Sequence, residues 1–206
     1  IATARELPST VPGTMGLRAR TYCTLFGLLS VTGMRISEAL SLNREDVDLN
    51  QALLTVRRTK FDKSRLIPIH KSTQEALRQY ACFRDCIYPQ PKTRSFLVSE
   101  RGTRLGYCAI LATFVRLSRE VGLRGLSDSH GPRMHDFRHR FAVNTLIRWY
   151  REGADIERRI HVLSTFLGHV KFSYTYWYLS AVPELMQYAV ARLESIGKEH
   201  CHEDIP

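Results

Sequence analysis

Apolar side chains recur along most of the chain at the spacing that places them on one face of an α-helix. In the first such stretch, residues 18–31, they occupy positions i, i+3, i+4 and i+7. These positions are Tyr22, Leu25, Phe26 and Leu29. Similar stripes predict further helices over residues 35–42, 72–86, 110–121, 135–151, 156–167 and 183–197. Gly33 and Gly168 directly follow two stripes and are predicted to end them, because glycine accepts the left-handed conformation that commonly closes a helix.

The period changes to that of β-strands between residues 47 and 69. Ser72, with Glu75 at the capping-box position, is predicted to begin the helix that follows. Short runs bounded by turns predict a small antiparallel sheet, with a hairpin tip at residues 60–63. The three predicted strands are residues 47–49, 53–57 and 66–69. The expected fold class is therefore mainly α with a small antiparallel β-sheet, an α+β fold.

The chain of 206 residues is long enough for a sizeable buried core, and we expect a single domain over residues 1–206. Within it, residues 1–14 are predicted to be an extended N-terminal segment and residues 198–206 a tail. A hydrophobic fraction of 44% excludes a disordered chain. The first residue is not methionine, so we expect a piece cut from a longer protein.

The balance of charge limits the partners. Lys and Arg total 30 and Asp and Glu total 20, a formal net charge of +10. This surplus favours a polyanion such as nucleic acid or an anionic membrane surface, while a basic surface that serves only solubility remains open. No apolar run approaches the ~18 residues of a membrane helix. The five cysteines form no C-x-x-C pair, which predicts reduced, buried thiols in a cytoplasmic protein.

Two early segments concentrate side chains that suit an anion. Arg35 and Glu38 share a helix face, so the carboxylate could orient the guanidinium. An ordinary surface ion pair, which contributes little, is the alternative. The second segment is the hairpin, whose cations suit phosphate contacts, although a solvated turn explains them equally well. These cations are Arg57, Arg58, Lys60, Lys63 and Arg65.

Two later segments are rich in histidine. His135 and His139 lie at i and i+4, as in zinc proteases. The guanidinium of Arg138 shares the face of His135 and would repel Zn²⁺, whereas it suits a phosphate oxygen. Because zinc also requires ligands that the spacing does not supply, we expect no metal. Further along, His169 lies near a helix end and Tyr178 follows it by nine residues.

Together these side chains meet the needs of phosphoryl transfer without a metal. The guanidiniums of Arg35 and Arg138 can hold the non-bridging oxygens of a phosphodiester. A tyrosine nucleophile such as Tyr178 must lose its proton, and with a pKa of ~10 only about 0.1% is ionised at pH 7. His135 or the arginine pair could offset this cost. Lys60 suits the general acid that protonates the departing 5′-oxygen.

At this point the chain resembles the tyrosine site-specific recombinases, the phage integrase family, over about residues 30–180. The matching segments are Thr-Gly-Met-Arg35-Ile-Ser-Glu38-Ala-Leu, Lys60-Phe-Asp-Lys63-Ser-Arg65-Leu-Ile-Pro, His135-Asp-Phe-Arg138-His-Arg-Phe-Ala, and Leu-Gly-His169 with Tyr178. The resemblance implies catalytic roles for Arg35, Glu38, Lys60, His135, Arg138, His169 and Tyr178, the last as nucleophile. Tyr174 and Tyr176 compete for that role, but only Tyr178 stands nine residues after His169.

The resemblance also implies an activity and an assembly. Such enzymes cut one DNA strand at a time, form a 3′-phosphotyrosyl link with a free 5′-hydroxyl, and rejoin the strands without ATP, metal or other cofactor. Four protomers assemble on double-stranded DNA, while the isolated chain is expected to be a monomer in the cytoplasm, beside the bacterial nucleoid. The helix over residues 183–197 would pack on its own domain or on a neighbouring protomer. The N-terminal core-binding domain is expected to be absent, which predicts weak DNA binding by a mobile-element integrase or transposase fragment.

Cations that flank the matching segments are predicted to follow the DNA backbone. They are Arg57, Arg58, Lys63, Arg65, Arg133 and Lys171. If about six of them neutralise phosphates, the logarithm of the association constant falls with the logarithm of salt concentration at a slope of about −5.

Three other functions remain open: a type IB topoisomerase-like enzyme, a non-catalytic DNA-binding protein, and a zinc hydrolase built on His135 and His139. The sequence specifies neither the target site nor the choice among integration, excision and resolution.

Overall fold

The computed structural model describes residues 1–57, 64–169, 171, 173–181, 186–187 and 190. The predicted site residues Arg58, Lys60 and Lys63 lie outside these ranges, as do most of the expected helix over 183–197 and the tail over 198–206. Two compact units divide the chain, residues 1–138 and residues 139–206. The single catalytic domain over residues 1–206 stays a prediction.

The first unit combines helices with a three-stranded antiparallel sheet in the order β1-β2-β3. Its elements are η1 (Thr3–Glu6), α1 (Leu17–Thr32), α2 (Ile36–Ser41), η2 (Arg44–Asp46), β1 (Val47–Asp48), β2 (Leu53–Val56), β3 (Arg65–Pro68), α3 (Lys71–Ile87), α4 (Tyr107–Glu120) and the start of α5 (Asp136–Arg151). The predicted fold class, mainly α with a small antiparallel sheet, is confirmed.

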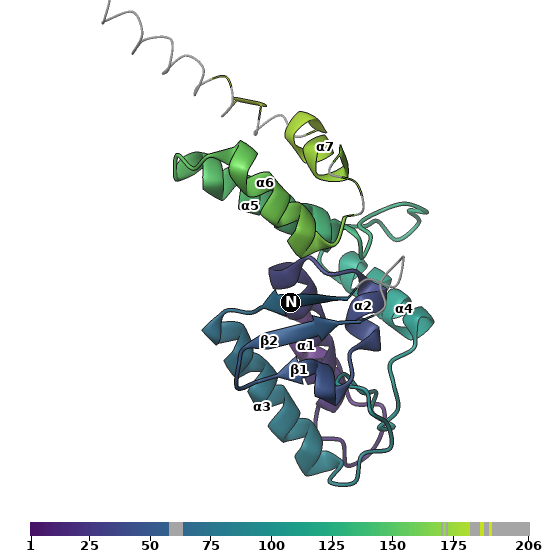
Figure 1. The fold of residues 1–206 in the computed structure, drawn as a ribbon. Coiled ribbons are helices and arrows are strands. Elements are labelled where there is room, and N and C mark those ends of the chain that lie inside the picture. Colours follow the sequence, from purple (N-terminus) through teal and green to yellow (C-terminus); the bar gives the residue numbers. More distant parts are fainter. Residues whose placement is uncertain (58–63, 170, 172, 182–185, 188–189, 191–206) are drawn as a thin grey trace, which may run out of the picture. The chain divides into compact units, whose positions relative to one another are not determined.

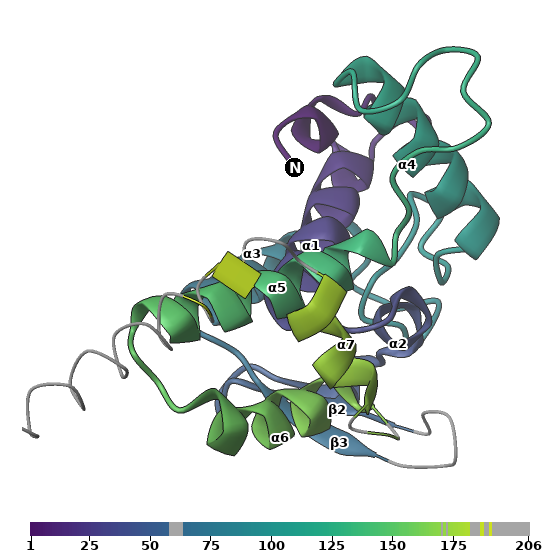
Figure 2. The ribbon, with the colours of Figure 1, turned by 90° about the horizontal axis from the view of Figure 1, so that it is seen from above.

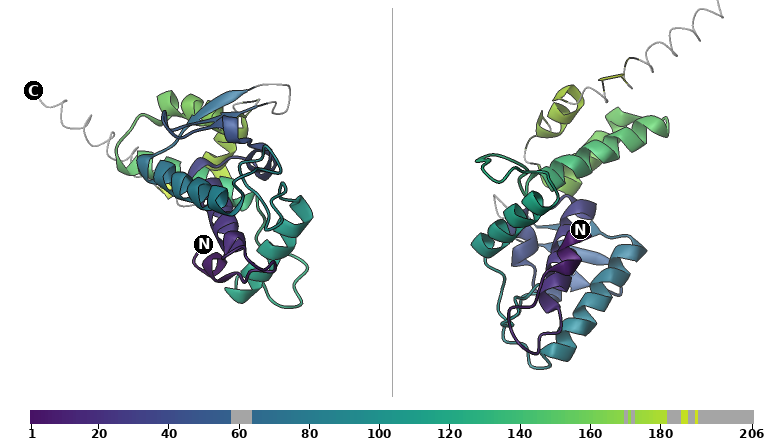
Figure 3. Two further views of the ribbon diagram at one scale, coloured as in Figure 1. Left: turned by 90° about the horizontal axis from the view of Figure 1, so that it is seen from below. Right: turned by 180° about the vertical axis from the view of Figure 1, so that it is seen from behind.

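The core of the first unit lies between the sheet and its helices. Strand β2 buries Leu54 and Val56, and β3 buries Ile67 opposite Leu54. Helices α1 and α3 pack side by side on one face of the sheet (Figures 1 and 3). The start of α1 is flanked by η1 and α4 (Figure 2). A left-handed Gly33, at φ +59°, ends α1 as predicted, and α2 follows after this turn and contacts α1.

Two local predictions need correction. The segment over residues 1–14 is not wholly extended, because η1 forms a 3₁₀ turn at Thr3–Glu6 that buries Ala4. Helix α3 begins before Ser72, and its N-cap is His70. The backbone of His70 is extended and its Nδ1 accepts a hydrogen bond from the N–H of Ser72 at 3.2 Å. The imidazole nitrogen therefore takes the capping role that the pattern assigned to a hydroxyl.

The expectation of buried thiols is wrong for the described cysteines. Helix α3 turns Leu77, Tyr80 and Arg84 inward, and Cys82 and Cys86, each two residues away from Arg84, therefore fall on the opposite face. The exposed cysteines are Cys82, Cys86 and Cys108, while Cys23 is half-buried. Among the described residues, no helix is both long and apolar enough to cross a membrane.

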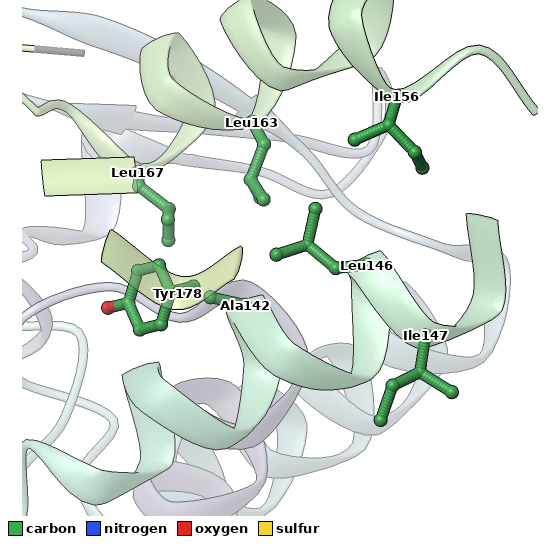
Figure 4. Packing of buried hydrophobic residues seen from close by; sticks show 7 residues of the cluster. All are labelled: Ala142, Leu146, Ile147, Ile156, Leu163, Leu167 and Tyr178. Carbon is green, nitrogen blue, oxygen red and sulfur yellow. The ribbon is translucent and has the colours of Figure 1, made fainter. Parts of the chain in front are cut away.

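The second unit is a small helical assembly built from the rest of α5, α6 (Ile156–Leu167) and α7 (Ser173–Ala181). Asp155 caps α6 by accepting from the N–H of Arg158, and Gly168 ends it at φ +69°, as predicted. The three helices share one apolar cluster (Figure 4). Its buried members are Ala142, Leu146, Ile147, Ile156, Leu163, Leu167 and Tyr178.

Candidate active site

Arg35 stands at the N-terminal end of α2, two residues after the turn at Gly33. Glu38, in the first turn of α2, accepts from the backbone N–H of Arg35 at 2.9 Å and from its Nη1 at 2.9 Å. The ion pair predicted between these two side chains is therefore present. The carboxylate is buried, whereas the arginine side chain is 33% exposed. Glu38 therefore binds Arg35 from the protein interior, and part of the Arg35 side chain remains accessible to solvent.

A second guanidinium, that of Arg65, also binds Glu38. Its Nη2 lies 2.8 Å from Oε2 and its Nη1 lies 3.1 Å from Oε1. Burial raises the pKa of Glu38, but the hydrogen bonds from Arg65 and Arg35 and the charge of Arg65 together outweigh burial, so this pKa lies below its ordinary value. Glu38 is therefore ionised at neutral pH and serves two arginines.

Arg138 is held at the turn that contains Gly33. Phe137 precedes it in α5 and stacks on Phe26, with ring centroids 5.8 Å apart, and also contacts Phe114. This anchorage leaves Arg138 fully buried, with its Nη1 donating to the carbonyl oxygen of Gly33 at 2.9 Å. The packing of Phe137 thus fixes the position of the Arg138 guanidinium.

A cavity of about 930 Å³ adjoins these groups and is lined by both Arg35 and His135. Arg124, His130 and Arg133 add further basic side chains to its wall. The apolar part of the wall consists of Met34, Ile36, Tyr107, Leu111, Val115, Pro132 and Met134. Arg35 and His135, both predicted to be catalytic and 100 positions apart in the sequence, therefore line the same cavity.

Tyr178 and His169 come together in the second unit. The Tyr178 side chain is buried, and Figure 4 shows its hydroxyl directed away from Leu146 and Ile147. Its ring lies nearly parallel to that of His169, with 16° between the planes and 6.4 Å between centroids. The Nδ1 of His169 lies 2.7 Å from the hydroxyl oxygen of the buried Thr175, which fixes the imidazole orientation.

The competing tyrosines differ from Tyr178 in their surroundings. Tyr174 and Tyr176 are exposed, by 56% and 44%. The ring of Tyr174 lies edge-on to that of His169, with centroids 6.1 Å apart. The Tyr178 ring contacts both His169 and His139, the latter edge-to-face at 5.4 Å. Tyr178 therefore differs from both competitors in its burial and in its contact with two histidines, and its role as the nucleophile stays a prediction.

Two residues near the candidate nucleophile were not assigned to it from the sequence. His139 was weighed only as a zinc ligand, yet its ring packs against Tyr178 and against Trp177 at 5.7 Å. Thr175 had no sequence signal at all, since it lies six residues after the histidine that it orients. The direct succession of Arg138 and His139 was the available signal for the first of these. Within the described part of the chain, no three His, Cys, Asp or Glu side chains cluster to hold a metal.

The described cations predicted to follow DNA fall into two groups. Arg133 and Lys171 are exposed, and Asp136 accepts from the backbone N–H of Arg133 at 2.8 Å. Arg57 is also largely exposed but pairs with the buried Asp46. Arg65 differs, because its guanidinium is turned to Glu38 and its side chain is only 11% exposed.

Replacing Glu38 by glutamine is expected to lower the free energy of unfolding at pH 7 by about 3 kcal/mol, because two guanidiniums lose a buried carboxylate. The pKa of Glu38 is lowered from 4.5 in the folded state, so its contribution is complete above the unfolded value and disappears as the pH falls through the folded value. Urea unfolding at several pH values should show the gap between wild type and Glu38→Gln shrinking as the pH falls below about 4.5. A gap that stays constant over this range would contradict the assigned ion pairs.

Solved structures share this fold. The crystal structure of XerA recombinase matches 90% of this chain and 65% of its own with a TM-score of 0.64, at 23% identity. That of XerH recombinase on a palindromic difH substrate matches 94% of this chain and 50% of its own, with a TM-score of 0.65 at 20% identity. The architecture is that of the tyrosine recombinase catalytic domain.

Sequence relatives lead from the fold to a family. Putative integrase/recombinase y4rB of Sinorhizobium fredii is 52% identical over 86% of this chain and 57% of its own length. Tyrosine recombinase XerC of Thermodesulfovibrio yellowstonii is 30% identical over 71% of this chain and 46% of its own. The sequence model of the phage integrase family matches residues 8–184, and the chain belongs to this family. It spans about half the length of the curated relatives that it matches.

Proposed function

We propose that the chain is the catalytic part of a site-specific DNA recombinase, which cuts and rejoins strands through a tyrosine. The observation that carries the proposal is the basic cavity shared by Arg35 and His135. Buried Arg138 is tied to the turn from which Arg35 emerges, so both guanidiniums have defined positions. Preorganised guanidiniums suit the charge that develops on a phosphodiester in its transition state. Membership of the phage integrase family supports the same reaction.

In the proposed reaction the hydroxyl oxygen of Tyr178 forms a bond to the scissile phosphorus, and the bond to the 5′-oxygen breaks. Arg35 and Arg138 stabilise the non-bridging oxygens. The phenolic proton passes to a base, for which His135 is the candidate, and Lys60 supplies a proton to the departing 5′-oxygen. One phosphodiester replaces another, so the bond energy is retained for rejoining and neither ATP nor metal is consumed.

His169 is proposed as a further donor to the same phosphate, with Thr175 holding its ring. Double-stranded DNA is the proposed partner. XerH recombinase is solved bound to a difH substrate, and the Tn1549 transposon integrase is solved in complex with transposon right end DNA. We expect a tetramer on paired sites and a monomer without DNA. The proposed location is the cytoplasm, beside the nucleoid of a bacterium.

A library of nicked duplexes tests the activity without a known target. Each duplex carries a randomised segment and a 5′-labelled strand nicked a few nucleotides beyond it, so that cleavage releases a short fragment and traps the protein on the label. The expected result is an adduct that survives denaturant, forms in EDTA, and converges on one recovered sequence.

Other outcomes select the alternatives. Adducts at scattered sequences, together with relaxation of a supercoiled plasmid, would favour a type IB topoisomerase-like enzyme. Binding with no adduct from any library member would contradict the proposal and favour a non-catalytic DNA-binding protein. Loss of DNA cleavage on chelation would point to the zinc hydrolase.

A further inference from the structure

We propose that Arg65 is a positioning residue for strand cleavage, which fixes Glu38 so that Arg35 is held toward the cavity. This inference rests on the proposed recombinase function. It changes the role of Arg65, which the sequence places among the cations that follow the DNA backbone. The proposal stands on the strand register, the contacts of one carboxylate and the exposure of two arginines.

The register of the sheet directs Arg65 inward. Residues directly opposite in an antiparallel pair lie on the same face, and Arg65 pairs with Val56. Val56 is buried, as is Ile67, two positions after Arg65 on the same strand. Leu66, between them, is exposed. The alternation along β3 therefore places the Arg65 side chain on the covered face of the sheet, where a cation requires an anion.

Glu38 is that anion. Both Nη atoms of Arg65 reach the two carboxylate oxygens, at 3.1 and 2.8 Å. This is the bidentate fork that a guanidinium forms with a carboxylate. Arg35 uses the same carboxylate differently, through one Nη atom and its backbone N–H. Arg65 thus orients the carboxylate plane, and the carboxylate in turn orients Arg35.

Arg35 and Arg65 differ in how far their side chains are exposed to solvent. The Arg35 side chain is 33% exposed and lines the cavity, whereas that of Arg65 is 11% exposed. A phosphate bound to Arg65 would have to displace Glu38, which is buried and ionised. Without Arg65, Glu38 would keep only the less buried arginine as its cationic partner among the described residues. We therefore expect Arg35 to lose its fixed direction when Arg65 is replaced.

The test compares Arg65→Gln, Glu38→Gln and the double variant, using the 206-residue chain and the nicked duplex recovered from the library. At saturating DNA, Arg65→Gln should lower the rate of adduct formation by about 10- to 100-fold, part of the effect of losing one preorganised donor. The double variant should be no slower than Glu38→Gln, because both changes release the same arginine. DNA affinity should stay within about threefold and the salt slope should not change.

Two further variants keep the test decisive. Arg65→Lys preserves the charge but not the fork, so its rate should lie between wild type and Arg65→Gln even if the latter unfolds. Arg78→Gln, which removes an exposed arginine paired with Glu75 on α3, should behave as wild type.

Contrary results are distinct. If Arg65→Gln forms adduct at the wild-type rate, but the slope of its DNA association constant against salt concentration is smaller by about 0.9, Arg65 contacts a phosphate. Losses that multiply in the double variant would show that Arg65 acts independently of Glu38. If wild type forms no adduct, the proposed function fails and this inference fails with it. If wild type and Arg65→Gln form adduct equally fast, only the positioning role is overturned.

Discussion

Tyr178→Phe is expected to abolish the covalent protein–DNA adduct, with a loss larger than any other single substitution in the chain. The phenylalanine ring retains the packing against Ala142 and Leu167 that buries this residue but lacks the hydroxyl oxygen that is proposed to bond to phosphorus. Because the ring volume is conserved, the unfolding temperature should change little. The measurement is adduct formation on the nicked duplex, followed on a denaturing gel with the label on the 5′ end of the cut strand.

Tyr176→Phe is the matched control, since it makes the same change two residues earlier on α7, at an exposed tyrosine. It should form adduct at the wild-type rate. If Tyr178→Phe still forms adduct and Tyr176→Phe does not, the nucleophile is Tyr176. In that case the contact of Tyr178 with His139 and His169 would serve packing alone.

Arg35→Gln is expected to slow strand cleavage by about 10²–10³-fold, because one preorganised cationic donor to the transition state is removed. The side chain is one-third exposed and lines the cavity, so its loss should affect chemistry more than folding. DNA affinity should fall much less than the rate, since many phosphates contribute to binding and only one reacts. Rates at saturating DNA and titrations at fixed salt separate the two quantities.

Arg78→Gln again serves as the control, because it removes a guanidinium that also pairs with a glutamate three residues away but lies on α3. A loss of affinity as large as the loss of rate would mean that Arg35 only anchors DNA. A rate equal to wild type would remove Arg35 from the proposed mechanism.

Periodicity predicted most of the fold because helix and strand patterns are local. The stripe through Leu25 and Leu29 produced α1, and Gly33 ended it in the left-handed conformation. The start of α3 was wrong because the backbone around His70 supplies a cap nitrogen that a search for Ser or Thr does not consider. The thiols were misplaced because cysteine was taken as apolar, while the face of α3 was decided by Leu77 and Tyr80.

In the candidate site too, contacts between residues close in sequence could be predicted, whereas contacts between distant residues could not. Spacing alone paired Arg35 with Glu38, since residues three positions apart are neighbours on a helix surface. Spacing did not reveal that Arg65 contacts Glu38, because a hairpin rich in cations resembles a solvated turn until the strand register is known. The buried face that receives Arg65 is defined only by its pairing with Val56.

The sequence by itself therefore determined the elements, the family resemblance and the residue types of the candidate site, all of which depend on patterns within a few residues. Only the tertiary structure decided which groups meet. Arg65 reaches Glu38 across 27 positions, and Arg138 reaches the carbonyl of Gly33 across 105. Such contacts follow from strand register and from the packing of Phe137 on Phe26. Because a buried charge is stable only when it is paired, the buried carboxylate of Glu38 stays bound to Arg35 and Arg65 and fixes their positions.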